Sequence, residues 1–143
     1  MRIIVVGACR SGKSTYAREL RAQGVPTFCT DPKSLVKDVE DGVNYLPERF
    51  ASKGMWSEAS RYIADVLFRM PGPYCIEGVA TVRALRKLLA DGRVRELDGV
   101  RIVRFTSQHA HAVTKPGQVT MAKAIDTVWS QIAGELKHLT EIR

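Results

Sequence analysis

One segment near the start of the chain decides its fold: Arg2-Ile3-Ile4-Val5-Val6-Gly7-Ala8-Cys9-Arg10-Ser11-Gly12-Lys13-Ser14-Thr15. The residues from Arg2 to Val6 are mostly β-branched and apolar, which predicts a buried strand. Residues Gly7 to Ser14 match the pattern G-x-x-x-x-G-K-[ST] at every fixed position. From Lys13 to Ala22 apolar side chains recur at helical spacing, and Gly24 ends that pattern. The segment therefore predicts a strand, a glycine-rich loop and a helix in direct succession.

Each fixed position of this loop has a physical role in holding phosphate. Gly7 and Gly12 allow backbone conformations that other residues resist, so the chain can wrap closely around an anion. The backbone N–H groups converge on that anion, and the helix that follows adds its positive end. Lys13 reaches the β- and γ-phosphates, and the Ser14 hydroxyl ligates Mg²⁺. We therefore predict that ATP with Mg²⁺ binds Gly7, Ala8, Cys9, Arg10, Ser11, Gly12, Lys13, Ser14 and Thr15.

The rest of the chain alternates between strand-like and helix-like patterns. Strands are predicted at 25–29, 74–78 and 100–105, and helices at 33–39, 56–70, 81–90 and 119–139. Residues 40–54 resemble a loop or lid, and residues 106–118 form a polar loop. We expect one α/β domain over residues 1–143, with helices on both faces of a short, mostly parallel sheet of four to five strands. Ligands of such sheets bind at the carboxyl ends of the strands.

At these residues the chain resembles the P-loop kinases, which phosphorylate nucleosides, nucleotides and small metabolites. Residues Gly7 to Thr15 carry the resemblance, and Ile76-Glu77-Gly78 is similar to the family's Walker B strand. Asp31 follows the second predicted strand, where some members, including polynucleotide kinases, carry a general base. The resemblance implies a P-loop NTPase fold with three αβα layers. The chain departs from the family at Arg10, in lacking an arginine-rich lid, and in lacking a recognisable fifth strand.

The two acidic residues have a functional and a structural interpretation. Glu77 is expected to organise Mg²⁺ together with Ser14, because phosphoryl transfer depends on positioning and charge neutralisation. Its alternative role is a salt bridge at the end of a strand. Asp31 is expected to act as general base on an acceptor hydroxyl. Its alternative role is an Asx-turn or a helix N-cap before Pro32 and Ser34.

Several basic residues are candidates for contacts with phosphate. Arg83 and Arg86 lie three residues apart on one predicted helix, so they share a face and are candidates to bind an acceptor phosphate. The alternative for both is a solvated helix face. Arg10 and Lys115 are candidates to stabilise the transferring phosphoryl group. The formal net charge is +7, and residues 81–104 carry seven arginines and lysines against three acidic residues, so we expect an anionic partner, with nucleic acid as one option.

The remaining composition indicates an ordinary globular chain. The three cysteines are far apart in sequence, which predicts reduced structural thiols and argues against a zinc site. His109 and His111 are expected to lie on a loop surface, and Trp56 and Trp129 are expected to pack in the core. No apolar run is long enough to span a membrane, and the short apolar run at the start does not resemble a signal peptide. We expect a cytoplasmic protein with no membrane partner.

These observations predict an ATP- and Mg²⁺-dependent phosphotransferase that acts on a nucleotide, a nucleoside or a similar small acceptor. One alternative is a polynucleotide 5′-hydroxyl kinase, which the basic stretch suits. The other is a regulatory module that binds a nucleoside triphosphate and transfers nothing. The short lid and the missing arginines favour the regulatory module, whereas Asp31 favours the enzyme.

Overall fold

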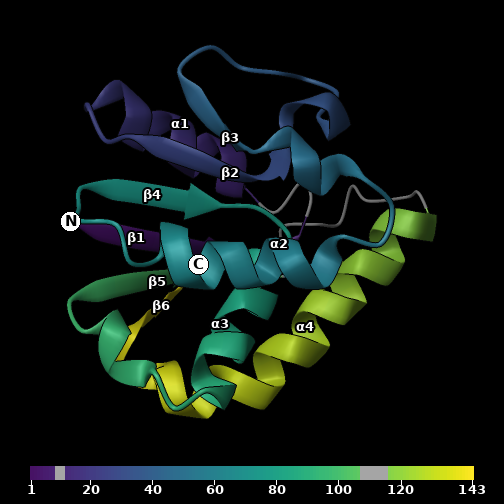
Figure 1. Ribbon diagram of the computed structural model, residues 1–143. Coiled ribbons are helices and arrows are strands. Elements are labelled where there is room, and N and C mark those ends of the chain that lie inside the picture. Colours follow the sequence, from purple (N-terminus) through teal and green to yellow (C-terminus); the bar gives the residue numbers. More distant parts are fainter. Residues whose placement is uncertain (9–11, 107–115) are drawn as a thin grey trace.

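The computed structural model describes residues 1–8, 12–106 and 116–143. These residues form one six-stranded sheet in the order β3-β2-β4-β1-β5-β6, and every neighbouring pair is parallel (Figure 1). The strands are β1 (Arg2–Val6), β2 (Thr27–Pro32), β3 (Val43–Leu46), β4 (Tyr74–Glu77), β5 (Val100–Arg104) and β6 (Thr140–Ile142). The α/β class and the parallel sheet are confirmed, whereas the predicted number of four to five strands is wrong.

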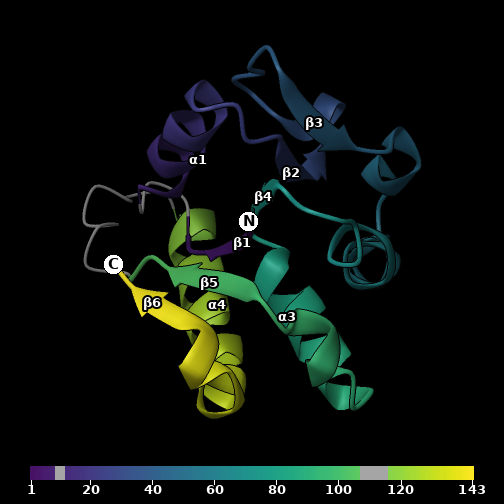
Figure 2. The same ribbon diagram turned by 90° about the vertical axis from the view of Figure 1, so that its left-hand side faces the viewer.

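Helices cover both faces of the sheet, as predicted. Along β1, Ile3 and Val5 pack with α1 (Lys13–Ala22) in one core cluster, and Ile4 and Val6 belong to a larger cluster on the opposite face. This larger cluster includes side chains of α2 (Trp56–Tyr62), α3 (Thr81–Ala90) and α4 (Pro116–Leu136). Figure 2 shows α1 on one side of the sheet and α3 and α4 on the other. The period-two alternation of β1 therefore separates the two cores.

Two short edge strands account for the error in the strand number. β3 lies within the predicted loop or lid, and β6 supplies the fifth strand that sequence patterns did not reveal. β6 is only three residues long and follows the helical turn η6 (Lys137–Leu139) directly, so it offers no alternating pattern to detect. Each edge strand pairs with one neighbour only, and short strands are common at the edges of sheets.

Two boundaries differ from the predictions in ways that affect function. β2 extends to Pro32, so Asp31 lies inside the strand and not after it. The predicted helix 56–70 is α2 followed by a π-helical turn, η3 (Ile63–Leu67), and it begins with a Trp56 side chain that is 51% exposed. The expectation that Trp56 packs in the core is wrong, because about half of its side chain is exposed at the start of α2. Trp129 does pack against the core.

The other helical turns are η1 (Lys33–Leu35), η2 (Glu48–Ala51) and η4 (Val94–Leu97). Cys29 and Cys75 are buried free thiols, and burial raises the pKa of each to about 12, so both stay protonated as structural thiols. Among the helices of the described residues, none has the length and apolar character needed to cross a bilayer.

Candidate functional site

Three charged residues meet at the carboxyl edge of the central strands. Lys13 opens α1 directly after the loop that follows β1, and its Nζ lies 3.2 Å from Oε2 of Glu77 at the end of β4. In the parallel register Cys29 of β2 pairs with Glu77, and Asp31 lies two residues further along β2. Lys13, Asp31 and Glu77 all line one cavity of about 510 Å³. The structure thus brings these three residues together at one edge of the sheet.

One described position of the predicted phosphate loop, Gly12, has a backbone conformation that favours glycine. Gly12 precedes α1 with a φ of +99°, which L side chains rarely adopt, so glycine is needed there. Gly7 and Ala8 are buried after β1, and Ser14 and Thr15 are exposed on the first turn of α1. Ser14 lines the same cavity as Lys13. The other predicted loop and phosphoryl-contacting positions, Cys9, Arg10, Ser11 and Lys115, lie outside the described residues, as do His109 and His111.

Asp31 is a half-buried carboxylate that lies near one positive charge, Lys13, and one negative charge, Glu77. Burial raises its pKa most, the charge of Glu77 raises it further, and the charge of Lys13 opposes both effects. The capping alternative fails at the nearest helical turn, because η1 begins after Pro32 without any side-chain capping hydrogen bond. A carboxylate with a raised pKa is a stronger proton acceptor than an ordinary one.

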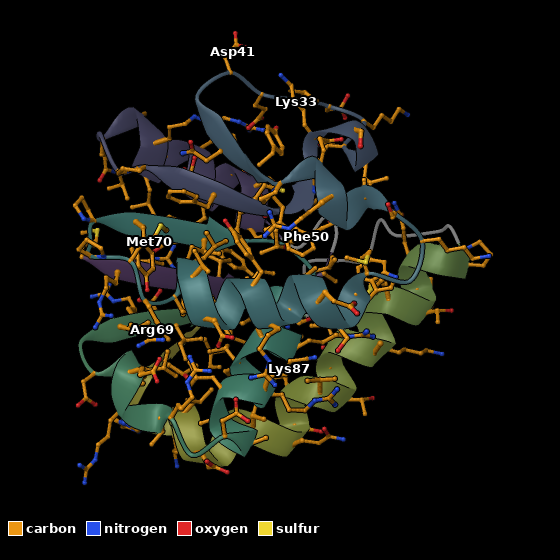
Figure 3. The ribbon with its side chains drawn as sticks, viewed as in Figure 1. Lys33, Asp41, Phe50, Arg69, Met70 and Lys87 are labelled. Carbon is orange, nitrogen blue, oxygen red and sulfur yellow. The ribbon has the colours of Figure 1, made fainter. Side chains whose placement is uncertain are left out.

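The far wall of the cavity is held in place by ion pairs. Glu40 accepts hydrogen bonds from Nε of Arg18 at 3.0 Å and from Arg21 at 3.2 Å, and its backbone N–H donates to the Tyr45 hydroxyl. These contacts join the chain between η1 and β3 to α1, and they lower the pKa of Glu40. Figure 3 shows Lys33 and Asp41 on the outer side of this connection. The segment predicted as a loop or lid is thus tied to the helix that carries Lys13.

Gly78 sets the distance between the two acid-bearing strands. It has a φ of +143°, and a Cβ at this position would lie 1.9 Å from Oγ1 of Thr30. The Thr30 hydroxyl also accepts a hydrogen bond from the backbone N–H of Ala80 at 3.4 Å. Only glycine allows β4 to turn into α3 this close to Thr30, which is adjacent to Asp31. The sequence pattern that singled out Glu77 and Gly78 contained no signal for this contact.

We expect Gly78→Ala to destabilise the fold by roughly 2–6 kcal/mol, the sum of backbone strain and overpacking. Chemical denaturation measures this loss. Gly92→Ala is the matched control, because Gly92 also has a positive φ but no atom within 4 Å of an added Cβ; it should cost only about 1–2 kcal/mol. Adding Thr30→Ala to Gly78→Ala removes the nearest clashing atom and should recover part of the loss. Equal costs for Gly78→Ala and Gly92→Ala would contradict the close contact.

A second, apolar cavity of about 190 Å³ adjoins the first. It lies between the end of β2 and α2, and its walls are largely the apolar side chains Pro32, Leu46, Phe50, Met55, Trp56 and Ala59. Phe50 is labelled between the sheet and α2 in Figure 3. Asp31 and Leu35 line both cavities, so the two meet at the end of β2. Sequence reasoning missed this cavity, because its walls come from the predicted loop and from Trp56, which was assigned to the core.

The predicted basic candidates on α3 lie away from both cavities. Arg83 is half-buried and lines neither of them, and Arg86 donates to Oε1 of Gln131 on α4 at 3.1 Å. Within residues 81–104, three of the seven basic side chains form ion pairs. Arg93 forms ion pairs with Asp65, Asp91 and Glu96, Arg101 with Glu141, and the buried Arg104 with Asp126. These pairs reduce the positive charge that the three arginines offer to an anionic partner.

The side chains that could bind a metal ion in this cavity are few, and they offer oxygen ligands. Ser14 and Glu77 line the same cavity, and no group of three or more histidine, cysteine, aspartate or glutamate side chains able to hold a metal ion exists in the described ranges. A hydroxyl and a carboxylate are hard ligands of the kind that Mg²⁺ takes when substrate phosphates and water complete its shell.

Comparison of the sequence with models of known protein families finds no match, and comparison with curated proteins finds none either.

Proposed function

We propose that this chain is an ATP- and Mg²⁺-dependent phosphotransferase of the P-loop kinase type that phosphorylates a hydroxyl group of a small acceptor. The observation that carries this proposal is the shared cavity of Lys13, Ser14, Asp31 and Glu77. A cation, a hydroxyl and two carboxylates at the end of a parallel sheet are the side chains that phosphoryl transfer needs. Asp31 is the member of this set that a pure nucleotide-binding module does not require.

The described residues at the end of the loop support a triphosphate site. Gly12 has the positive φ that the loop pattern calls for, α1 begins directly after it, and Lys13 supplies an ammonium group. When bound, ATP supplies the phosphoryl group and Mg²⁺ supplies countercharge. Ser14 and Glu77 are the residues that hold the metal ion in this proposal, and Lys13 holds the phosphates.

Each remaining side chain has a defined task. Asp31 accepts the proton of the acceptor hydroxyl as the hydroxyl oxygen bonds to the γ-phosphorus of ATP. The bond from that phosphorus to the bridging oxygen breaks, and ADP leaves with the electron pair. Lys13 neutralises negative charge on the transferring group, for which its present partner Glu77 is a suitable stand-in, since a carboxylate and a phosphate both accept from an ammonium group. The ion pairs from Glu40 to Arg18 and Arg21 of α1 hold the opposite wall of the cavity in position.

The two alternatives receive less support. A polynucleotide 5′-hydroxyl kinase needs a basic surface for the strand, and the arginines of residues 93–104 are largely ion-paired. A regulatory module gives no reason to bury Asp31 near Lys13, because an ionised carboxylate repels a triphosphate. The enzyme explains that carboxylate as a base.

The proposal is tested by incubating the purified chain with γ-labelled ATP, Mg²⁺ and a panel of acceptors. The panel contains small alcohols, nucleosides, nucleoside monophosphates, and DNA and RNA with 5′-hydroxyl ends. We expect label in a small hydroxyl compound and none in nucleic acid. Binding of ATP without transfer to any acceptor would support the regulatory module, and transfer to 5′-ends would support the polynucleotide kinase.

A further inference from the structure

The apolar cavity beside Trp56 has no task in the phosphate chemistry described above. It is built from hydrophobic side chains of β2, β3, η2 and α2, and it adjoins the charged cavity at Asp31 and Leu35. Two of the exposed large hydrophobic side chains, Leu35 at 59% and Trp56 at 51%, line it. Exposed apolar side chains around a cavity are a common feature of ligand sites.

The size of the cavity limits what it can hold. At about 190 Å³ it is smaller than the cavities that enclose whole drug-sized ligands, which measure roughly 300–1,000 Å³. An engineered apolar cavity of about 150 Å³ holds benzene. The cavity therefore matches one ring or a branched hydrocarbon group of similar bulk.

The charge of the walls limits the ligand further. Among the residues that line this cavity, all within the described ranges, Lys53 is the only cation and Asp31 the only anion. Arg49 is close by but lies over the rings of Phe50 and Tyr62, at 4.5 and 5.3 Å. A phosphate or carboxylate placed here would lose water without gaining the paired arginines that such groups usually find in proteins. The walls thus favour an uncharged ligand.

We propose that the acceptor is an uncharged hydroxyl compound whose hydrophobic part, about one ring in size, occupies this cavity against Trp56 while its hydroxyl lies at Asp31. The position of the hydroxyl rests on the proposed phosphotransferase activity. Binding of the hydrophobic part in the cavity does not depend on that activity and can be tested separately. Asp31 belongs to both cavities, so a ligand seated in the apolar one has a short path to the charged one. A nucleoside monophosphate is disfavoured as a ligand of the apolar cavity, because a phosphate placed there would find no arginine among the lining residues.

Tryptophan fluorescence tests binding without any need for catalysis. The chain has two tryptophans, so Trp129→Phe leaves Trp56 as the only tryptophan, and excitation at a wavelength that tyrosine does not absorb reports on Trp56 alone. The probes are benzyl alcohol, its charged counterpart benzyl phosphate, and glycerol as a hydroxyl compound without a ring. We expect benzyl alcohol to shift the emission of Trp56 to shorter wavelength in a saturable way, benzyl phosphate to bind at least 10-fold more weakly, and glycerol to have no effect.

Two variants test whether benzyl alcohol binds in the apolar cavity. Ala51→Leu adds bulk to a half-exposed wall residue and should weaken benzyl alcohol binding at least 10-fold. Ala133→Leu, at a half-exposed position of α4 outside the cavity, is the matched control and should leave binding unchanged. In transfer assays Trp56→Ala should raise the KM for the acceptor far more than it lowers kcat, and Val66→Ala, another exposed apolar side chain, should change neither.

The outcomes separate this inference from the proposed function. Saturable benzyl alcohol binding that Ala51→Leu weakens, without transfer to any acceptor, would support the cavity as a ligand site and overturn the phosphotransferase. Transfer to sugars or nucleotides that is insensitive to Ala51→Leu and Trp56→Ala would keep the phosphotransferase and overturn the inference. Competition between Mg²⁺-ATP and benzyl alcohol at Trp56 would also overturn it, because the cavity would then hold the adenine base.

Discussion

Lys13→Ala is expected to bind Mg²⁺-ATP roughly 100-fold or more weakly than the natural chain. The ammonium group of Lys13 donates charge-assisted hydrogen bonds to the phosphates, each contributing about 1.5–3 kcal/mol, and it has three donors. Two such bonds amount to roughly 3–6 kcal/mol, which is about 10²–10⁴-fold in affinity. Isothermal titration calorimetry with and without Mg²⁺ measures the loss.

The control must account for Glu77. The Lys13 side chain is only 11% exposed and pairs with Glu77, so Lys13→Ala leaves a shielded carboxylate without this cation. Lys13→Met with Glu77→Gln removes both charges and keeps most of the side-chain volume, so it should retain the fold and still fail to bind. Glu77→Gln alone should bind metal-free ATP at least as well as the natural chain, since a repelling charge is gone, but should gain less from Mg²⁺. Unchanged ATP affinity in a folded Lys13→Ala variant would exclude this role for the loop.

The fold class was predictable because its decisive segments are long or strongly patterned. The run Arg2 to Val6 forms β1, which lies between β4 and β5 in the sheet and is covered by helices on both faces. A strand that is buried on both faces is apolar along nearly its whole length. The edge strands β3 and β6 face weaker demands, because each has a single partner and half-exposed side chains. Each is only three or four residues long, too short to show a periodic pattern, so only the assembled sheet identifies them as strands.

The candidate site was predictable where one local motif carries the chemistry. Lys13, Ser14 and Glu77 follow from strand–loop–helix and strand-end patterns, and parallel topology brings strand ends to one edge. The contact between Gly78 and Thr30 joins residues 48 positions apart, so no local pattern encodes it. Trp56 has the helical spacing of a core residue, yet its side chain is 51% exposed at the start of α2. The apolar cavity went unrecognised because Trp56, one of its wall residues, is expected in the core from spacing alone.

Asp31→Asn should reduce phosphoryl transfer by about 10²–10⁴-fold while ATP binding stays intact. Asparagine has nearly the same shape as aspartate but cannot take the proton of the acceptor hydroxyl, and general-base help is typically of this size. Single-turnover transfer rates and calorimetric ATP affinity measure the two effects separately. In the natural chain the transfer rate should rise with pH through the raised pKa of Asp31, since the base works only when ionised. That rise should be missing from Asp31→Asn.

The same substitution, Asp31→Asn, should increase the stability of the folded chain although it lowers the transfer rate. Burial and Glu77 raise the pKa of Asp31 above its ordinary value of 3.8, so the ionised carboxylate is less favourable in the folded chain than in the unfolded one. This cost is fully present above the raised pKa and disappears as the pH falls below the ordinary value. Asp31→Asn should therefore have a higher free energy of unfolding than the natural chain at pH 7, and the gain should shrink on acidification to about pH 3. A structural cap predicts the reverse, because its carboxylate would be stabilised in the folded state. A variant that transfers phosphate at the natural rate, or that melts earlier than the natural chain at neutral pH, would make Asp31 a structural residue and require another base.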